Sequence, residues 1–378
     1  MRVGVVGCGG ISGSHLSGYA NLSQTEIVAV SDINETALHK RADEFEVKGR
    51  YTNYQQMLDQ EGLDLVSICT HAPLHMPIAV AAAKRGINVL SEKPLAVDLV
   101  QADRMFSACT RAGVHLAVSH QFRFTPIFRQ VKQWVDDGRI GQLRSIREVG
   151  KGREAGFELM EMGVHYFDEI DFFLGGIEWV HAQISYQGHS ATIEDIMHSS
   201  QLCQTDQRDN GTVAGDTMLV HVGGKNGTYG EIELYCRPER HGWMMGPHLL
   251  GSRGQMMVKP NAKTGIDEIW YCPFDVSFAN QTPDWELVPF DEALFLIEGK
   301  AWPSRHTIWS IQNVVTAIRE GQQPELSGKQ ALVSLECVSA TYESHFTAAR
   351  VNLPMTDRQH PLEKRQNTKI EKENGEQY

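Results

Sequence analysis

The chain has 378 residues, of which 41% are hydrophobic and 22% are charged, and its formal net charge at pH 7 is −12. This length and composition are typical of an enzyme with two domains that each bury a core. The negative charge argues against nucleic acid or an anionic membrane surface as a partner. The seven cysteines include no CxxC pair, so we expect neither a disulfide framework nor a thiolate metal site. The early core strand and the lack of a long apolar run predict a cytoplasmic protein.

The amino-terminal segment predicts a nucleotide-binding turn. An apolar strand, Arg2 to Gly7, runs into the sequence GCGGIS. Gly7 permits a tight turn, and Gly9 lets the backbone approach a pyrophosphate. A helix that begins near Ile11 offers free N–H groups and the positive end of its dipole. Ser12 stands in the place of the third glycine, and the motif alone is weak evidence because many glycine-rich turns bind nothing.

Asp32 indicates which dinucleotide such a turn would bind. It follows a second predicted strand, Glu26 to Ser31, at the spacing at which an acid meets the adenosine ribose. A carboxylate accepts hydrogen bonds from the 2′-hydroxyl and repels a 2′-phosphate. Ile33 and Asn34 supply no arginine to hold a phosphate. We therefore expect NAD rather than NADP.

The segment Val89 to Pro94 places a lysine at the end of a strand. The strand runs into Glu92, Lys93 and Pro94, and open α/β sheets bind their ligands at strand ends. Partial burial lowers the pKa of a lysine toward neutrality, which suits a proton shuttle. Proline fixes the backbone beside it. Taken alone, Lys93 is equally well explained as an ordinary surface lysine.

Alternating strands and helices predict a doubly wound parallel sheet in the first part of the chain. The further strands that we expect there are Leu63 to Cys69, Ile87 to Ser91 and Val114 to Ser119, and the helices are Pro77 to Arg85 and Leu99 to Ala112. This Rossmann domain covers residues 1–120 in our prediction.

The pattern changes after Gln121 and predicts an α+β domain, residues 121–355, with a large, mainly antiparallel open sheet. The expected strands are Leu143 to Val149, Trp179 to Tyr186, Thr217 to Val222, Glu231 to Tyr235, Gln255 to Val258, Glu268 to Cys272 and Trp285 to Val288. The expected helices are Pro126 to Asp137, Phe157 to Leu174, His306 to Arg319 and Lys329 to Thr347. Residues 356–378 are polar and charged, so we expect a mobile tail or an arm on another subunit.

The predicted helix Phe157 to Leu174 carries a second candidate site. With about 3.6 residues per turn, Glu161, His165 and Asp168 fall on one face. A histidine is the natural general base for an alcohol. The alternatives are a hydrated polar face or a histidine that is satisfied within the core. A metal site is disfavoured because the stripe offers too few ligands and lacks an HExxH motif.

Jointly, these features resemble the Gfo/Idh/MocA family, which is named after glucose-fructose oxidoreductase and inositol dehydrogenase. The resemblance extends from Met1 to about Pro354. It rests on GCGGIS with His15 following, Asp32, ICTHAPLH at 68–75, EKP at 92–94, HQFRF at 120–124, MGVH at 162–165 with Asp168, and LGSRG at 250–254.

The resemblance implies NAD as the cofactor and one secondary alcohol of a sugar, cyclitol or sugar derivative as the substrate. Lys93 and His165 would be the catalytic residues, with His165 as the base and Lys93 orienting the hydroxyl, or the reverse. A homodimer or homotetramer through the second sheet is also implied. The cofactor-binding residues that the resemblance implies are Gly7, Gly9, Gly10, Ile11, Asp32, Thr70, Pro73, His75, Glu92, Lys93 and Gln121.

The acid at Glu161 departs from the family pattern, in which aspartate is common at this position. A side chain longer by one methylene changes which substrate hydroxyl the carboxylate holds. The full set of expected substrate-binding residues is Glu161, Asp168, Lys93, Arg153 and Trp243. Arginines of this kind, including Arg123, are otherwise solvated or salt-bridged, and a loop tryptophan otherwise packs.

Three functions are compatible with the sequence. The first is an NAD-dependent dehydrogenase of a sugar or cyclitol. The second is an NAD-dependent glycoside-processing enzyme that oxidises transiently, eliminates or isomerises, and returns the hydride. The third is a non-catalytic NAD-binding regulator, which the presence of both Lys93 and His165 disfavours. Accumulation of free NADH would separate the first function from the second.

Overall fold

The chain divides into two compact units in the computed structural model. The first unit consists of residues 1–121, 209–211 and 306–335, and the second of residues 122–208, 212–305 and 336–378. The structure describes residues 1–150, 159–202, 209–235, 246–259, 267–274, 284–302 and 306–375. The first unit therefore takes up a late segment of the chain.

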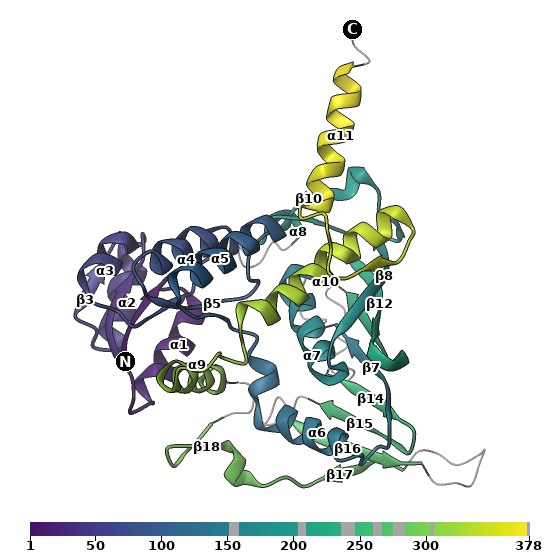
Figure 1. The fold of residues 1–378 in the computed structure, drawn as a ribbon, viewed down its shortest axis with the longest axis horizontal. Coiled ribbons are helices and arrows are strands. Elements are labelled where there is room, and N and C mark those ends of the chain that lie inside the picture. Colours follow the sequence, from purple (N-terminus) through teal and green to yellow (C-terminus); the bar gives the residue numbers. More distant parts are fainter. Residues whose placement is uncertain are drawn as a thin grey trace. The chain divides into compact units, whose positions relative to one another are not determined.

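A six-stranded parallel sheet forms the centre of the first unit, with the order β3-β2-β1-β4-β5-β6 (Figure 1). Its strands are β1 (Arg2–Val6), β2 (Glu26–Ser31), β3 (Gly49–Tyr51), β4 (Leu65–Ile68), β5 (Asn88–Ser91) and β6 (Leu116–Val118). The strand order reverses between β1 and β4, and ligands bind beyond the carboxyl ends of the strands at such a point. The Rossmann sheet predicted from the sequence is confirmed.

Helices cover both faces of this sheet, which explains why β4 and β6 are buried along their whole length and mainly apolar. On one face α4 (His75–Ala83) lies beside α5 (Leu99–Ala112), and on the other α1 (Gly10–Ala20) packs against α9 (Ile308–Glu320). Helix α2 (Glu35–Glu44) is capped at its amino end by Asn34, whose side chain accepts a hydrogen bond from Ala37 N–H. The strand β3 and the helices α2 and α3 (Tyr54–Gln60) were absent from the sequence prediction.

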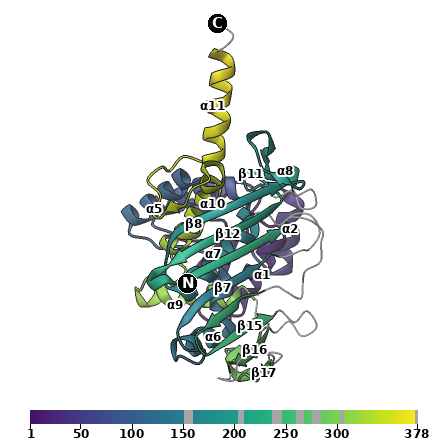
Figure 2. The ribbon, with the colours of Figure 1, turned by 90° about the vertical axis from the view of Figure 1, so that its right-hand side faces the viewer.

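The second unit is built on a ten-stranded sheet, onto which Figure 2 looks. The order is β17-β16-β15-β14-β7-β13-β12-β8-β20, and β9 pairs with β8. The pair β7 and β13 is parallel, and the other pairs are antiparallel. The strands are β7 (Leu143–Val149), β8 (Ile177–Tyr186), β9 (His189–Ser190), β12 (Thr217–Gly224), β13 (Tyr229–Tyr235), β14 (His248–Gly251), β15 (Gly254–Lys259), β16 (Glu268–Pro273), β17 (Glu286–Val288) and β20 (Val351–Asn352). The prediction of a large, mainly antiparallel sheet is confirmed.

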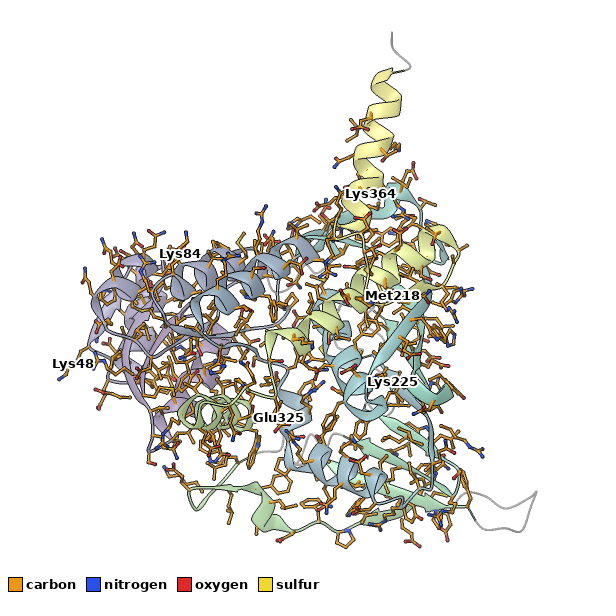
Figure 3. The ribbon with its side chains drawn as sticks, viewed as in Figure 1. Lys48, Lys84, Met218, Lys225, Glu325 and Lys364 are labelled. Atoms are coloured by element: carbon orange, nitrogen blue, oxygen red, sulfur yellow. The ribbon has the colours of Figure 1, made fainter. Side chains whose placement is uncertain are left out.

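Helices of the second unit pack on this sheet and bury alternate side chains of its strands. Helix α7 (Val164–Leu174) contacts β7 and β13, and α6 (Pro126–Asp136) contacts β15 and β16. Met218 of β12 is 1% exposed, whereas Lys225 just beyond that strand is exposed; both are labelled in Figure 3. The smaller elements are α8 (Ser199–Leu202) and the two-stranded pairs β10 (Ile196–His198) with β11 (Thr212–Ala214) and β18 (Leu296–Ile297) with β19 (Lys300–Ala301).

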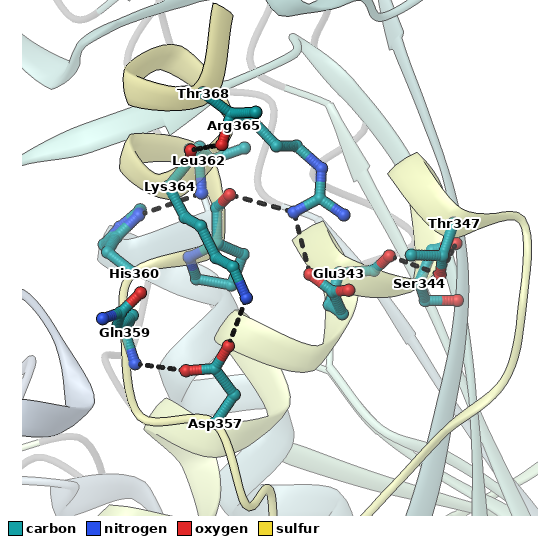
Figure 4. A network of polar contacts seen from close by, with 11 residues as sticks. Glu343, Ser344, Thr347, Asp357, Gln359, His360, Leu362, Lys364, Arg365 and Thr368 are labelled. Atoms are coloured by element: carbon teal, nitrogen blue, oxygen red, sulfur yellow. Dashed lines mark hydrogen bonds and ion pairs between the residues drawn. The ribbon is translucent and has the colours of Figure 1, made fainter. Parts of the chain in front are cut away.

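The polar carboxyl-terminal segment contains a helix, α11 (Pro361–Gly375), that follows α10 (Gly328–Thr347) and β20. Figure 4 shows the contacts that hold its first turns. Arg365 donates to Glu343 of α10 at 2.8 Å, Lys364 donates to Asp357 at 2.6 Å, and Leu362 is fully buried. Leu362 thus gives a polar segment one apolar anchor, whereas Ile370 further along is exposed. The mobility expected of this segment stays a prediction.

Among the described helices, none combines the length and the apolar composition that crossing a membrane requires.

Candidate active site

The glycine-rich turn between β1 and α1 is open on the side where a ligand would approach. Gly7 has a φ of +94°, and a Cβ on it would lie 2.5 Å from the Cys69 carbonyl oxygen, so the position requires glycine. A Cβ on Gly9 or Gly10 would meet no atom within 4 Å. Both residues are exposed, and no side chain caps the start of α1. The first N–H groups of α1 are therefore available to an anion.

Two backbone groups orient the Asp32 carboxylate at the end of β2. Its Oδ2 accepts from Cys8 N–H at 2.7 Å, and its Oδ1 accepts from Asn34 N–H at 2.8 Å. The bond to Cys8 ties the carboxylate directly to the glycine-rich turn. Because Asp32 is only half-buried, each oxygen retains acceptor capacity for a ribose hydroxyl.

Arg41 reaches the same turn, and the sequence analysis did not identify it. Its Nη2 donates to the Gly9 carbonyl oxygen at 2.9 Å, and its Nη1 donates to Glu44 at 2.6 Å. A Cβ on Gly13 would lie 2.8 Å from Arg41 Nη1, so the small residue makes room for the guanidinium. The only available signal was the arginine of a helix that begins three residues after Asp32, and such arginines are common on exposed helices.

A buried ion pair lies directly behind Lys93. Glu92 Oε1 is 2.8 Å from His15 Nε2, and the side chains are 8% and 0% exposed. Burial disfavours the imidazolium, but Cys69 and Glu92 outweigh it and raise the pKa of His15 to about 10. Burial likewise disfavours the Glu92 carboxylate, but His15, Lys93 and Ser119 hold the pKa of Glu92 below its usual range. The contact thus favours the charged forms of both groups.

His75 connects the loop after β4, which contains Thr70, to the loop after β5, which contains Lys93 and Pro94. Its Nδ1 lies 2.8 Å from the Pro94 carbonyl oxygen, and its Nε2 lies 3.1 Å from the Thr70 carbonyl oxygen. Burial lowers the pKa of His75 despite these two acceptors, so the neutral ring donates to one of them at a time. Pro73 and Thr70 are half-buried beside it. Contacts of Thr70, Pro73, His75 and Glu92 with a cofactor stay predictions.

In the described part of the predicted helix Phe157 to Leu174, a π-helical turn, Leu159–Gly163, precedes α7, which starts at Val164. Glu161 lies in this turn, so the α-helical spacing that we used to place it beside His165 does not apply to it. Glu161, His165 and Asp168 are 6%, 3% and 2% exposed. The hydrated alternative for this face is therefore wrong. The His165 ring packs against Phe122, with 4.6 Å between the ring centroids.

Arg123 and Asp168 form a buried, bidentate ion pair. Arg123 Nε donates to Asp168 Oδ2 at 2.7 Å, and Nη2 donates to Oδ1 at 2.6 Å. The guanidinium also lies over the Phe172 ring, 5.2 Å from its centroid. The salt-bridged alternative for Arg123 is thus confirmed, and a contact of Asp168 with substrate stays a prediction.

Of the remaining predicted residues, Gln121, Lys93 and His165 are described by the structure, and two others are not. Gln121 precedes Phe122 in a short helical turn, and its Oε1 is buried without a hydrogen-bond donor among the described residues. Such an orphaned acceptor is what a ligand contact would satisfy. Arg153 and Trp243 lie outside the described residues. Lys93 belongs to the first unit and His165 to the second.

Residues 1–120 match the model of the Gfo/Idh/MocA oxidoreductase family, described as an NAD-binding Rossmann fold. The amino-terminal domain belongs to this family. The resemblance found in the sequence is therefore confirmed. The matched domain contains the glycine-rich turn, Asp32 and the segment around Lys93 described above.

Relatives extend the similarity beyond this Gfo/Idh/MocA domain. D-apiose dehydrogenase of Paraburkholderia graminis is 27% identical, over 94% of this chain and 91% of its own. Myo-inositol 2-dehydrogenase of Thermotoga maritima is 26% identical, over 70% of this chain and 77% of its own. The solved structure of levoglucosan dehydrogenase in complex with NADH and levoglucosan has a TM-score of 0.75 at 19% identity, and the match covers 94% of this chain and 100% of that one. This likeness shows that both units share their fold with a solved protein.

The residues of the Gfo/Idh/MocA domain fit NAD, the cofactor of its family. Gly9, Gly10 and Ile11 leave an open cradle at the start of α1, where a pyrophosphate binds. Asp32 presents a fixed carboxylate for the adenosine ribose. The nearby Arg41 is paired with Glu44 and with the Gly9 carbonyl oxygen.

Proposed function

We propose that this chain is an NAD-dependent dehydrogenase that transfers a hydride between nicotinamide and one secondary alcohol of a sugar, cyclitol or sugar derivative. The placement of Lys93 carries the proposal. It follows β5, at the carboxyl end of the sheet that also carries the open glycine-rich turn. The named relatives, which act on a sugar and on a cyclitol, support the substrate class.

Binding of the cofactor is assigned to residues of the first unit. The N–H groups that begin α1 hold the pyrophosphate, and Asp32 accepts hydrogen bonds from the adenosine ribose. Bound NAD supplies the nicotinamide carbon that accepts the hydride. Gln121, whose amide oxygen is buried without a donor among the described residues, is assigned to a contact with the cofactor or substrate.

Oxidation of an alcohol also requires a group that takes the hydroxyl proton. We assign that step to His165, because an imidazole accepts a proton near neutral pH. Lys93 orients the hydroxyl and stabilises the developing alkoxide with its ammonium charge. Glu161, buried one π-helical turn before His165, holds a second hydroxyl. The reverse assignment of His165 and Lys93 gives the same net reaction.

The experiment that tests the function is a substrate panel with NAD and NADP, read by nicotinamide fluorescence. The panel contains D-apiose, myo-inositol, levoglucosan, aldohexoses and alkyl glucosides. We expect NADH to accumulate stoichiometrically with one member of the sugar or cyclitol class. Conversion of a glycoside while bound NAD stays unchanged would instead establish the redox-neutral glycoside-processing reaction. NAD binding without conversion of any member would contradict both reactions.

A further inference from the structure

The ion pair between His15 and Glu92 suggests a role for a residue outside the predicted site. His15 lies on the inner face of α1, and Glu92 directly follows β5. The residues are 77 positions apart, and their 2.8 Å contact joins the helix of the glycine-rich turn to the segment that carries Lys93.

A network of hydrogen bonds fixes both ends of this contact. His15 Nδ1 lies 3.1 Å from Ser67 Oγ, and the Tyr19 hydroxyl lies 2.7 Å from the same oxygen. At the other end, Lys93 N–H donates to Glu92 Oε2 at 3.3 Å. His15 and Tyr19 have no exposed surface. Glu92 thus uses one carboxylate oxygen on His15 and the other on the backbone of Lys93.

The charges around Glu92 determine what this arrangement does. Lys93 and His15 both stabilise its carboxylate. The same carboxylate acts to raise the pKa of His75, against the larger effect of burial. The neighbours of His15 are Glu92, Cys69 and Ser67, with Tyr19 behind Ser67. A lone carboxylate beside Lys93 would stabilise the ammonium and hold its proton. A carboxylate that is already paired with an imidazolium does so far less, because the two charges nearly cancel at the lysine.

We propose that His15 is a positioning residue: its imidazolium holds and neutralises the Glu92 carboxylate, which then fixes the Lys93 backbone without retaining the Lys93 proton. The proposal rests on the proposed function in one respect: under its reverse assignment Lys93 takes the hydroxyl proton, and a weaker hold on its own proton favours that step. Its test does not require turnover, so failure of one proposal is distinguishable from failure of the other.

The test is competitive labelling of lysines with acetic anhydride across about pH 6 to pH 11, in full-length protein without substrate. Lys93 is half-buried and accessible to a small reagent, and Lys84, exposed on the same unit (Figure 3), is the internal reference. Mass spectrometry of the two peptides gives the pH at which each amine is half-labelled. The variant His15→Gln keeps an amide donor toward Glu92 but removes the charge.

We expect the Lys93 midpoint to rise by about one pH unit in His15→Gln, with the Lys84 midpoint unchanged. The double variant His15→Gln/Glu92→Gln removes both charges and should return the midpoint to the wild-type value. Tyr19→Phe, which disturbs the same buried network but leaves the ion pair, should leave it unchanged. An unchanged midpoint in His15→Gln, or no recovery in the double variant, would overturn the proposal.

Two further measurements separate this role from a merely structural one. The affinity for NAD, measured by calorimetry, should change by less than about threefold in His15→Gln. A loss of NAD binding with an unchanged Lys93 midpoint would assign His15 to the glycine-rich turn instead. Nitrogen-15 NMR of labelled histidines should find the wild-type His15 ring doubly protonated at about pH 8, and a neutral ring there would refute the proposal.

If His15→Gln does not fold, Glu92→Gln provides the test. Removing the carboxylate cannot stabilise the Lys93 ammonium, so the Lys93 midpoint should stay or fall, and the His15 ring should lose its proton at a lower pH. A Lys93 midpoint that rises in Glu92→Gln would contradict the charge cancellation on which the proposal rests.

Discussion

Each unit of the molecule holds a buried ion pair next to a predicted catalytic residue, and the two pairs differ in kind. In the first unit, His15 and Glu92 share one hydrogen bond beside Lys93. In the second, Arg123 and Asp168 share two, and Asp168 lies one helical turn beyond His165 on α7. One pair includes a group that titrates, whereas the guanidinium of the other stays charged at any pH at which the protein is folded.

The pH dependence of stability follows from this difference. Because the pKa of folded His15, about 10, lies above its usual value of 6.5, the protonated ring gives its full stabilisation below that usual value, down to the acidic pH at which Glu92 is protonated. Its contribution decreases as the pH rises and is lost above about 10. Arg123 keeps its charge throughout this range. The pair that titrates thus lies next to the predicted catalytic lysine, and the permanently charged pair fixes the helix that carries His165.

The largest effect should come from breaking the pair in the second unit. We expect Arg123→Met to lower the free energy of unfolding by about 3–5 kcal/mol, because the buried carboxylates of Asp168 and, at 3.9 Å, Asp171 lose this guanidinium. Denaturant unfolding followed by fluorescence measures the loss. The control is the double variant Arg123→Met/Asp168→Leu, which should recover part of it, since Asp171 remains. A single variant as stable as the wild type would show that the pair is solvated in solution.

The next effect concerns the lysine beside the pair of the first unit. Lys93→Met should lower turnover by about a hundredfold or more, because a positioned proton-handling group is lost. NAD affinity should change little, since Asp32 and the turn are untouched. Lys84→Met is the matched control at an exposed lysine of the same unit. Full activity in Lys93→Met would return Lys93 to the class of ordinary surface lysines.

The variant His165→Asn decides which of the two residues is the base. Asparagine keeps a hydrogen-bond donor but cannot titrate near neutral pH. Turnover should fall, and the limb of the pH profile that reports the base should disappear. If turnover is unimpaired, the base is Lys93.

The sequence predicted the first unit better than the second, for reasons that particular residues show. Apolar strands between glycine-rich turns and a strand-end acid locate Gly7, Asp32 and Lys93 without knowledge of distant contacts. The strand β3 was missed because it has three residues, and α2 because it is mainly polar. The contact of His15 with Glu92 spans 77 positions, and no periodicity reveals such a pair.

In the second unit, the helical period is not uniform, and the sequence pattern does not reveal this. The π-helical turn at Leu159–Gly163 shifts Glu161 relative to His165, and Arg123 approaches Asp168 from 45 positions away. The sequence identified the polar residues of this region correctly as a group. It could not show which of them pair with each other and which remain for a substrate.

A smaller effect tests the shifted acid in the second unit. Glu161→Asp should change the difference in transition-state binding energy between sugar epimers by about 1–3 kcal/mol, and with it their ranking as substrates. The reason is that a shorter carboxylate would leave one hydroxyl of a buried substrate unpaired. The ratios of kcat/KM for a substrate and its epimers measure this change. Glu363→Asp, at an exposed position on α11, is the control. An unchanged ranking would remove Glu161 from the pocket.

The smallest effect should come from Asp32, and it sharpens the contrast with Arg123. The partners of Asp32 are backbone N–H groups of Cys8 and Asn34 at a half-buried position, so its removal leaves no buried charge. Asp32→Ser should therefore spare stability but weaken NAD binding by about tenfold, which corresponds to about 1.4 kcal/mol. NADP binding should improve, because the repulsion of its phosphate is removed.

Calorimetric titration with both dinucleotides measures the change, and Asp32→Asn is the control that keeps an acceptor without the charge. Equal use of NAD and NADP by the wild type would show that Asp32 does not select the cofactor, while a large loss of stability in Asp32→Ser would place the carboxylate among the structural ion pairs.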